Sequence, residues 1–250
     1  MITQAESSGP RRVRAAYQQL AAHQKPAAGV PWFTRVVNRP LGRGAAAVAY
    51  RLGLTPDQVT VASALLWSGA LAVLAATALP AGAATTMVVT GLLAVAFVLD
   101  SADGQLARLT DTGSRAGEWL DHVLDAARIV AFHLAVGVAI LRSGDLPIEA
   151  AAVAGAFGLV ASTRFFAQML AEQLLATTRR DAPPTAHHPG RALVQLPADT
   201  VVLNACLLLL PWPSVFLGVY AGLAAANAVL LAATLGRRHA ELRRAGREGA

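Results

Sequence analysis

The apolar residues of the chain gather in long blocks separated by short polar segments. The block from Thr60 to Leu79 carries no charged residue, and the block from Ile148 to Leu170 carries very few. A bilayer core about 30 Å thick needs roughly 20 helical residues to cross it. Backbone groups cannot stay unpaired in lipid, so such segments cross as helices. The pattern therefore predicts membrane-spanning helices.

We expect an all-α integral membrane protein with six transmembrane helices. The expected spans cover about 60–79, 83–100, 123–141, 148–172, 199–211 and 214–235. The fifth is short and ends at the segment Pro211-Trp212-Pro213. Nothing in the chain alternates in the way that is typical of barrel strands. The first sixty residues are basic and interrupted by prolines, so we expect no cleavable signal peptide.

The segment before the first span has a different pattern. Residues 1–30 are basic, and we expect them to be partly disordered. From about Trp32 to Tyr50, apolar and basic positions recur with helical periodicity, which is typical of an amphipathic helix in the membrane interface. A solvated linker helix is the alternative. The membrane domain is then expected at 31–236, followed by a basic cytoplasmic tail at 237–250.

Composition and charge agree with a membrane protein and fix its orientation. The chain is 55% hydrophobic and 14% charged, whereas about a quarter of the residues in a soluble protein are charged. Eight basic residues, Arg11 to Arg51, precede the first span, and Arg142 is alone on the opposite side. By the positive-inside rule, both termini and the active site face the cytoplasm of a cell membrane. A pI near 10.6 fits a basic face against anionic lipid, so we expect no nucleic-acid partner.

Four of the fifteen acidic residues lie close together where the second span ends and the third begins: Asp100, Asp103, Asp121 and Asp125. Their spacings of three and four residues place each pair on one helix face. An acid within a span costs about 2.5–3.5 kcal/mol, so intramembrane carboxylates indicate function. Converging carboxylates repel one another unless cations compensate them. Carboxylate ligands suit Mg²⁺ or Mn²⁺, and a pair of such ions can assist phosphoryl displacement. A polar hairpin with solvated acids is the alternative.

From Asp100 to Asp125 the chain reads D-x-x-D-G-x-x-A-R, eight residues, then G-x-x-x-D-x-x-x-D. This pattern resembles that of the CDP-alcohol phosphatidyltransferases. The segment from Leu54 to Thr60 is also similar to the one that family members carry there, so the resemblance covers roughly 30–236. It implies a membrane transferase of phospholipid biosynthesis. Such an enzyme moves a phospho-alcohol unit from a CDP-alcohol donor to an acceptor hydroxyl and releases CMP. It also implies a homodimer.

The resemblance implies a role for each matching residue. Asp100, Asp103 and Asp121 look like metal ligands, and Asp125 looks like both the catalytic base and a ligand of a second Mg²⁺ or Mn²⁺ ion. The residues that match donor-binding positions are Asp57, Gln58, Val59, Thr60, Gly104, Ala107, Arg108 and Ser114.

The acceptor is less well defined by the pattern. Arg164, inside the fourth span, is the better candidate for holding an anionic acceptor, and Arg191 in the following loop is expected to assist. Snorkelling of Arg164 to the lipid headgroups is the alternative. The neighbouring pair His187-His188 is expected to be polar surface rather than a metal site.

Two other functions stay open. CDP-diacylglycerol is the favoured donor, but a soluble CDP-headgroup such as CDP-inositol would use the same chemistry. A divalent-cation transporter also uses intramembrane carboxylates. Against a transporter, the acids gather at the cytoplasmic ends of two spans, and the last two spans carry no acid at mid-membrane.

Overall fold

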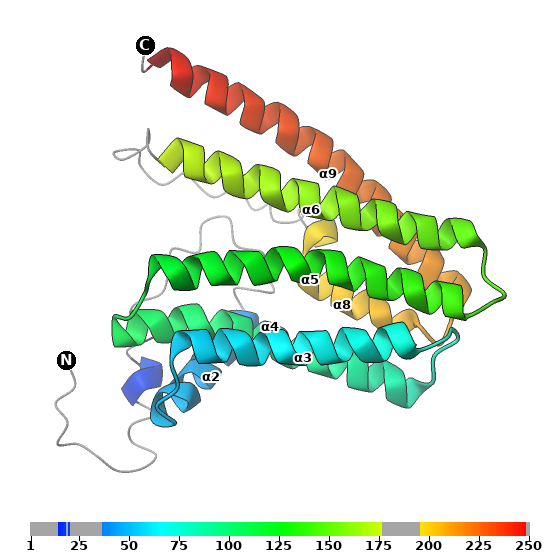
Figure 1. The fold of residues 1–250 in the computed structure, drawn as a ribbon, viewed down its shortest axis with the longest axis horizontal. Coiled ribbons are helices and arrows are strands. Elements are labelled where there is room, and N and C mark those ends of the chain that lie inside the picture. Colours follow the sequence, from blue (N-terminus) through cyan, green and yellow to red (C-terminus); the bar gives the residue numbers. More distant parts are fainter. Residues whose placement is uncertain (1–14, 19, 21–36, 177–195, 249–250) are drawn as a thin grey trace. The chain divides into compact units, whose positions relative to one another are not determined.

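The computed structural model describes residues 15–18, 20, 37–176 and 196–248, and within these ranges every regular element is helical. The helices in chain order are α2 (Arg39–Arg51), α3 (Pro56–Ala76), α4 (Ala83–Thr110), α5 (Arg115–Arg142), α6 (Ile148–Ala176), α8 (Thr200–Cys206) and α9 (Pro213–Glu248), with single 3₁₀ turns at Leu196–Ala198 and Leu207–Leu209 (Figure 1). The expected all-α class is confirmed for the described residues.

Five of these helices are long and apolar enough to cross a membrane: α3, α4, α5, α6 and α9. They coincide with five of the six expected spans, so the chain has the helices of a multi-pass membrane protein. The remaining expected span, 199–211, corresponds to a shorter apolar stretch, Thr200–Leu209. That length falls below the roughly 20 residues that a straight crossing needs, so a sixth span stays a prediction.

Helix α4 continues past the expected end of its span, because the backbone rather than the hydropathy ends it. It runs through Asp100 and Asp103 to Thr110. Asp111 then adopts a left-handed conformation with φ of 54°, which aspartate tolerates better than most residues. The Thr112 N–H donates to the carbonyl of Ala107 at 3.1 Å, which is the bond of a Schellman motif. Both acids of α4 therefore lie on regular helix.

Helix α5 begins after a four-residue connection. The Ser114 hydroxyl oxygen accepts a hydrogen bond from the Gly117 N–H at 3.0 Å, which is the bond of a helix N-cap. The Ser114 carbonyl accepts from the Glu118 N–H at 3.0 Å. Since α5 starts at Arg115, Asp121 and Asp125 also lie on regular helix. The short connection leaves α4 and α5 as successive helices that carry all four motif acids.

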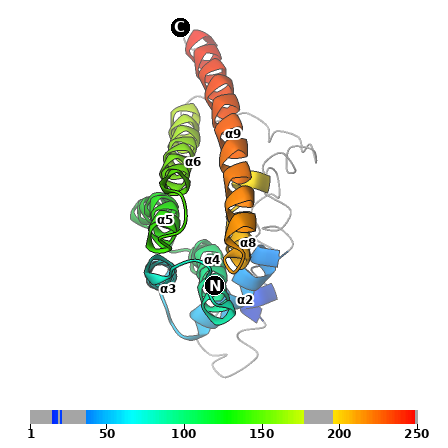
Figure 2. The same ribbon diagram turned by 90° about the vertical axis from the view of Figure 1, so that its right-hand side faces the viewer.

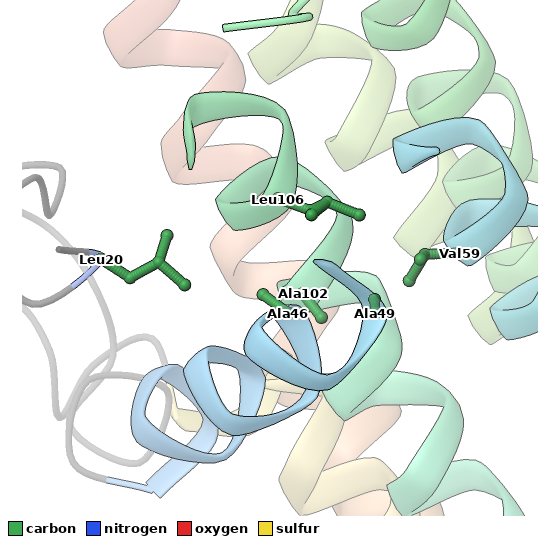
Figure 3. Packing of buried hydrophobic residues seen from close by; sticks show 6 residues of the cluster. All are labelled: Leu20, Ala46, Ala49, Val59, Ala102 and Leu106. Carbon is green, nitrogen blue, oxygen red and sulfur yellow. The ribbon is translucent and has the colours of Figure 1, made fainter. Parts of the chain in front are cut away.

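The chain divides into two compact units, residues 1–70 with 91–124 and residues 71–90 with 125–250. In the first unit, Ala46 and Ala49 of α2 pack with Val59 of α3 and with Ala102 and Leu106 of α4 (Figure 3). These buried side chains fix α2 and the start of α3 against the acid-bearing end of α4.

Close approach of α2 to α4 depends on a glycine. A Cβ atom at Gly42 would lie 2.7 Å from the Ser101 hydroxyl oxygen and 2.8 Å from Nε2 of Gln105, so a side chain here would force these two groups to move. The same Gln105 amide donates to the carbonyl of Arg39 at 3.2 Å. Helix α2 is thus bonded to the turn of α4 that follows Asp103.

In the second unit, α6 and α9 pack along one another (Figure 2). His133 of α5 is held between them. Its Nδ1 lies 2.6 Å from the hydroxyl of Tyr220 on α9, and its ring centroid lies 4.2 Å from that of Phe157 on α6. Arg238 of α9 also pairs with Glu172 of α6 at 2.7 Å. These contacts join α5 and α6 to α9 within the second unit.

Candidate active site

The most deeply buried acid of the motif is Asp103, which is 6% exposed. Its Oδ2 accepts a hydrogen bond from the Thr60 hydroxyl at 2.6 Å, and its Oδ1 accepts from the Gly104 N–H. About one turn further along α3, the Ser63 hydroxyl donates a hydrogen bond to the carbonyl of Ala96 on α4 at 2.8 Å. These bonds tie the first turns of α3 to α4, so the two motif segments form one site.

Three of the four motif acids interact within the first unit. The carboxylates of Asp100 and Asp121 both act electrostatically on that of Asp103. Asp100 and Asp121 are half-buried, where water screens repulsion between like charges less than it does at the surface. Such a group of carboxylates requires a nearby cation for all of them to stay ionised.

Helix α5 offers a second, overlapping group. Asp121, His122 and Asp125 each present one ligand atom, and these atoms lie within 4.8 Å of one another. Carboxylate oxygens with one imidazole nitrogen suit Mn²⁺, and carboxylates alone suit Mg²⁺. The donor set therefore fits a divalent cation. Sequence reasoning missed His122. Its one signal was its position directly after a motif acid, and that position does not show where the ring lies.

Asp125 has a basic neighbour that the sequence analysis did not include in the site. The guanidinium of Arg128, one turn further along α5, forms an ion pair with its carboxylate. Both side chains are largely shielded from water, with 16% of Arg128 and 24% of Asp125 exposed. Asp125 is the first α5 residue of the second unit, whereas Asp121 belongs to the first.

The expected donor-binding residues at the start of α3 divide into two kinds. Gln58 and Thr55 form a reciprocal capping box: the Thr55 N–H donates to Gln58 Oε1 at 2.9 Å, and the Gln58 N–H to Thr55 Oγ1 at 3.3 Å. Val59 is buried in the cluster of Figure 3. Asp57 is exposed. The structure thus gives Gln58 and Val59 evident roles in the fold.

Asp57 and Ser114 both lie beside a glycine of α5. A Cβ atom at Gly117 would lie 3.1 Å from Oδ1 of Asp57 and 3.3 Å from the Ser114 hydroxyl oxygen. That is tighter than ordinary van der Waals contact, so the missing side chain leaves room for both polar groups. Two residues expected to hold the donor therefore lie beside the same residue of α5.

The expected donor-binding residues of α4 leave open space beside the acids. A Cβ atom at Gly104 would meet only Nη1 of Arg108, at 3.7 Å. Gly104 and Arg108 are exposed and Ala107 is half-buried. The charges of Arg108 and Arg39 act on one another, so α2 adds a second cation near this face.

Of the expected acceptor-binding residues, only Arg164 lies within the described residues; Arg191 and the pair His187-His188 lie outside them. Arg164 is half-buried on α6. Its Nε is buried and has no hydrogen-bond partner in the described part of the chain. Arg164 belongs to the second unit, whereas Asp100 and Asp103 belong to the first.

Comparison with known proteins places the chain in a family. The family model for CDP-alcohol phosphatidyltransferase matches residues 53–235, which contain every motif acid. No curated protein sequence matches the chain.

Two solved structures of Mycobacterium tuberculosis phosphatidylinositol phosphate synthase (PgsA1) have a similar fold, one with CDP-DAG bound and one in complex with manganese and citrate. Both are 19% identical, with a TM-score of 0.56, and cover 81% of this chain. The match spans 93% of the first solved chain and 88% of the second. Since the family model covers most of the chain, the protein belongs to the CDP-alcohol phosphatidyltransferase family.

Proposed function

We propose that this protein is a metal-dependent phosphotransferase that uses CDP-diacylglycerol as donor and releases CMP. The observation that carries the proposal is the buried carboxylate of Asp103, which accepts a hydrogen bond from Thr60 and lies within electrostatic reach of Asp100 and Asp121. Membership of the family supports the reaction class. The donor is proposed because a relative of similar fold has been solved with CDP-DAG bound.

In this proposal the motif acids Asp100, Asp103, Asp121 and Asp125 hold a pair of Mg²⁺ or Mn²⁺ ions. Bound metal would neutralise charge on the transferring phosphate. The acceptor hydroxyl loses its proton to Asp125 as its oxygen attacks the β-phosphorus. The bond from that phosphorus to the CMP oxygen breaks, and CMP leaves with the electron pair.

The remaining donor contacts follow from charge and space. Arg108 presents a forked guanidinium that suits a pyrophosphate. Ser114 and Asp57 each lie beside Gly117 and supply a hydroxyl and a carboxylate for polar groups of the nucleotide. The open face at Gly104 gives the donor room to approach α4. For the acceptor, Arg164 and Arg191 supply cationic partners.

We also propose the topology that the sequence predicts: six spans, both termini cytoplasmic in a cell membrane, and a homodimer. Helix α2 would lie in the interface, where its exposed Leu41 and Val48 meet the headgroup boundary. The basic residues of α2 and of the end of α9 would then face the same, anionic leaflet.

The deciding experiment offers purified protein in nanodiscs several CDP-alcohols, CDP-inositol among them, with inositol phosphate, glycerol phosphate or inositol as acceptor. Products are identified by mass spectrometry and CMP release is timed. Asp100→Ala should lower the rate by about 100-fold or more, because several kcal/mol of charge stabilisation is lost. Asp145→Ala, an exposed acid of the α5–α6 connection, is the matched control.

Full turnover by the Asp100→Ala variant, or by the wild type in excess chelator, would overturn the metal mechanism. CMP released only from a soluble CDP-headgroup would replace CDP-diacylglycerol as donor. Mn²⁺ uptake into sealed proteoliposomes without CMP release would favour a transporter instead.

A further inference from the structure

The carboxylate of Asp125 can pair with two kinds of cation, a guanidinium and a metal ion. Asp125 is paired with the guanidinium of Arg128 on the next turn of α5. The same residue belongs to the group, with Asp121 and His122, whose ligand atoms lie within 4.8 Å of one another. Because a carboxylate oxygen that faces a guanidinium is poorly placed to bind a metal ion at the same time, the two cations compete.

The ion pair between Asp125 and Arg128 is expected to persist until another cation takes the carboxylate. Guanidinium–carboxylate pairs are charge-assisted and about twice as strong as neutral hydrogen bonds. Only 16% of the Arg128 side chain is exposed, so salt and water screen the pair weakly. Arginine does not lose its proton in proteins. Arg128 therefore leaves Asp125 by moving to another anion, because an unpaired guanidinium in a partly buried site is costly.

We propose that Arg128 is an internal counter-ion that holds Asp125 until metal and a phosphate-bearing ligand arrive together. Metal takes the carboxylate, and the released guanidinium pairs with the phosphate that the nucleotide brings. Arg128 thereby weakens metal binding to the free protein and couples it to nucleotide binding. The inference rests on the proposed function in one respect, namely that Asp125 is a metal ligand.

Coupling of this kind has a reciprocal signature. If nucleotide raises the affinity for metal, metal raises the affinity for nucleotide by the same factor. In a variant that lacks Arg128, the Asp125 carboxylate is already available to metal. Such a variant should bind metal tightly without nucleotide, and added nucleotide should raise its metal affinity only slightly.

The test measures free Mn²⁺ by electron paramagnetic resonance during titration of the purified protein in nanodiscs, with and without CDP. For Arg128→Gln without CDP, we expect the Mn²⁺ Kd to fall about tenfold or more, the scale set by one charge-assisted hydrogen bond. CDP should lower the Mn²⁺ Kd of the wild type strongly and that of the variant only slightly. Arg142→Gln, an exposed arginine at the far end of the same helix, should behave as the wild type does.

Two further variants keep the proposal open to refutation. Arg128→Lys retains the charge without the fork, and its Mn²⁺ Kd should lie between those of the wild type and Arg128→Gln. In an Asp125→Asn background, Arg128→Gln should no longer change the Mn²⁺ Kd, because the shared carboxylate is gone. If Arg128→Gln does not fold, the lysine variant carries the test.

An unchanged or higher Mn²⁺ Kd in Arg128→Gln would overturn the counter-ion role and make Arg128 a residue that only positions Asp125. The proposed function would survive that result as long as Asp100→Ala abolishes turnover. Failure of the wild type to bind Mn²⁺ at all, with or without CDP, would instead remove the metal site and the proposed function with it.

Discussion

The hydroxyl of Thr60 lies 2.6 Å from the carboxylate of Asp103, and the hydrogen bond between them joins the first turns of α3 to the acid-bearing end of α4. Both residues are buried, with 8% and 6% of their surfaces exposed. A hydroxyl that donates to a carboxylate holds one lone pair and leaves the rest of the carboxylate for other partners. Thr60 therefore orients Asp103 as well as packing beside it.

Replacing Thr60 with valine tests this role. Valine keeps the branched shape but leaves the Asp103 oxygen without its donor, and hydrogen bonds to charged groups are worth enough to change a rate about 10–100-fold. We expect kcat/KM for the donor to fall by that order, and Thr60→Ser to recover most of it. The measurement is the initial rate of CMP release against donor concentration.

Thr77→Val is the matched control, because the Thr77 hydroxyl bonds only within its own helix, to the carbonyl of Val73 at 2.8 Å. If Thr60→Val and Thr77→Val have the same kinetics, the bond to Asp103 has no part in catalysis.

Gly104 gives a prediction about space. A Cβ atom at this position would meet only Arg108 within 4 Å, so we expect Gly104→Val to fold and insert normally. The valine would fill the face where we place the donor, and we expect donor binding to be lost while the melting temperature barely changes. Equilibrium binding of a radiolabelled CDP-donor checks this.

Gly91→Val on the same helix is the control, because a Cβ atom at Gly91 meets nothing within 4 Å. Wild-type donor affinity in Gly104→Val would show that the nucleotide does not lie against this face of α4.

Asp125→Asn separates proton transfer from binding. The amide preserves the shape of the side chain but cannot take the proton from the acceptor hydroxyl. A positioned general base raises the rate by about 10²–10⁴-fold. We expect kcat to fall by that factor with little change in the KM for the donor. Equal losses of donor affinity and rate would make Asp125 mainly a ligand.

The sequence predicted the long helices and the placement of each acid pair on one helix, because both depend on local patterns. Twenty apolar residues in a row can satisfy their backbone in lipid only as a helix, and the spacing of Asp121 and Asp125 places both on one face. The expected spans set the end of α4 too early and the start of α5 too late, because they follow hydropathy, and the apolar run of α4 stops at Leu99. The hydrogen bonds of α4 instead continue until Asp111 turns left-handed.

Contacts between distant segments could not be predicted from local sequence patterns in the same way. Thr60 and Asp103 are 43 residues apart, and only resemblance to a family joined their segments. Arg128 follows Asp125 by one turn, but spacing alone does not distinguish an ion pair from two solvated charges. The resemblance assigns Gln58 to the donor, and the structure adds that its side chain accepts a hydrogen bond from the Thr55 N–H at the start of α3.

A substitution of Arg164 tests what kind of acceptor the enzyme takes. Its Nε is buried on α6 without a hydrogen-bond partner among the described residues, and a cation in that position is costly unless a ligand pairs with it. If it holds an anionic acceptor, Arg164→Ala should raise the acceptor KM about 10–100-fold and leave the donor KM nearly unchanged. Arg142→Ala, an exposed arginine of α5, is the control. Normal expression with unchanged kinetics would mean that Arg164 reaches the headgroups by snorkelling, and that the acceptor presents a neutral hydroxyl to this part of the enzyme.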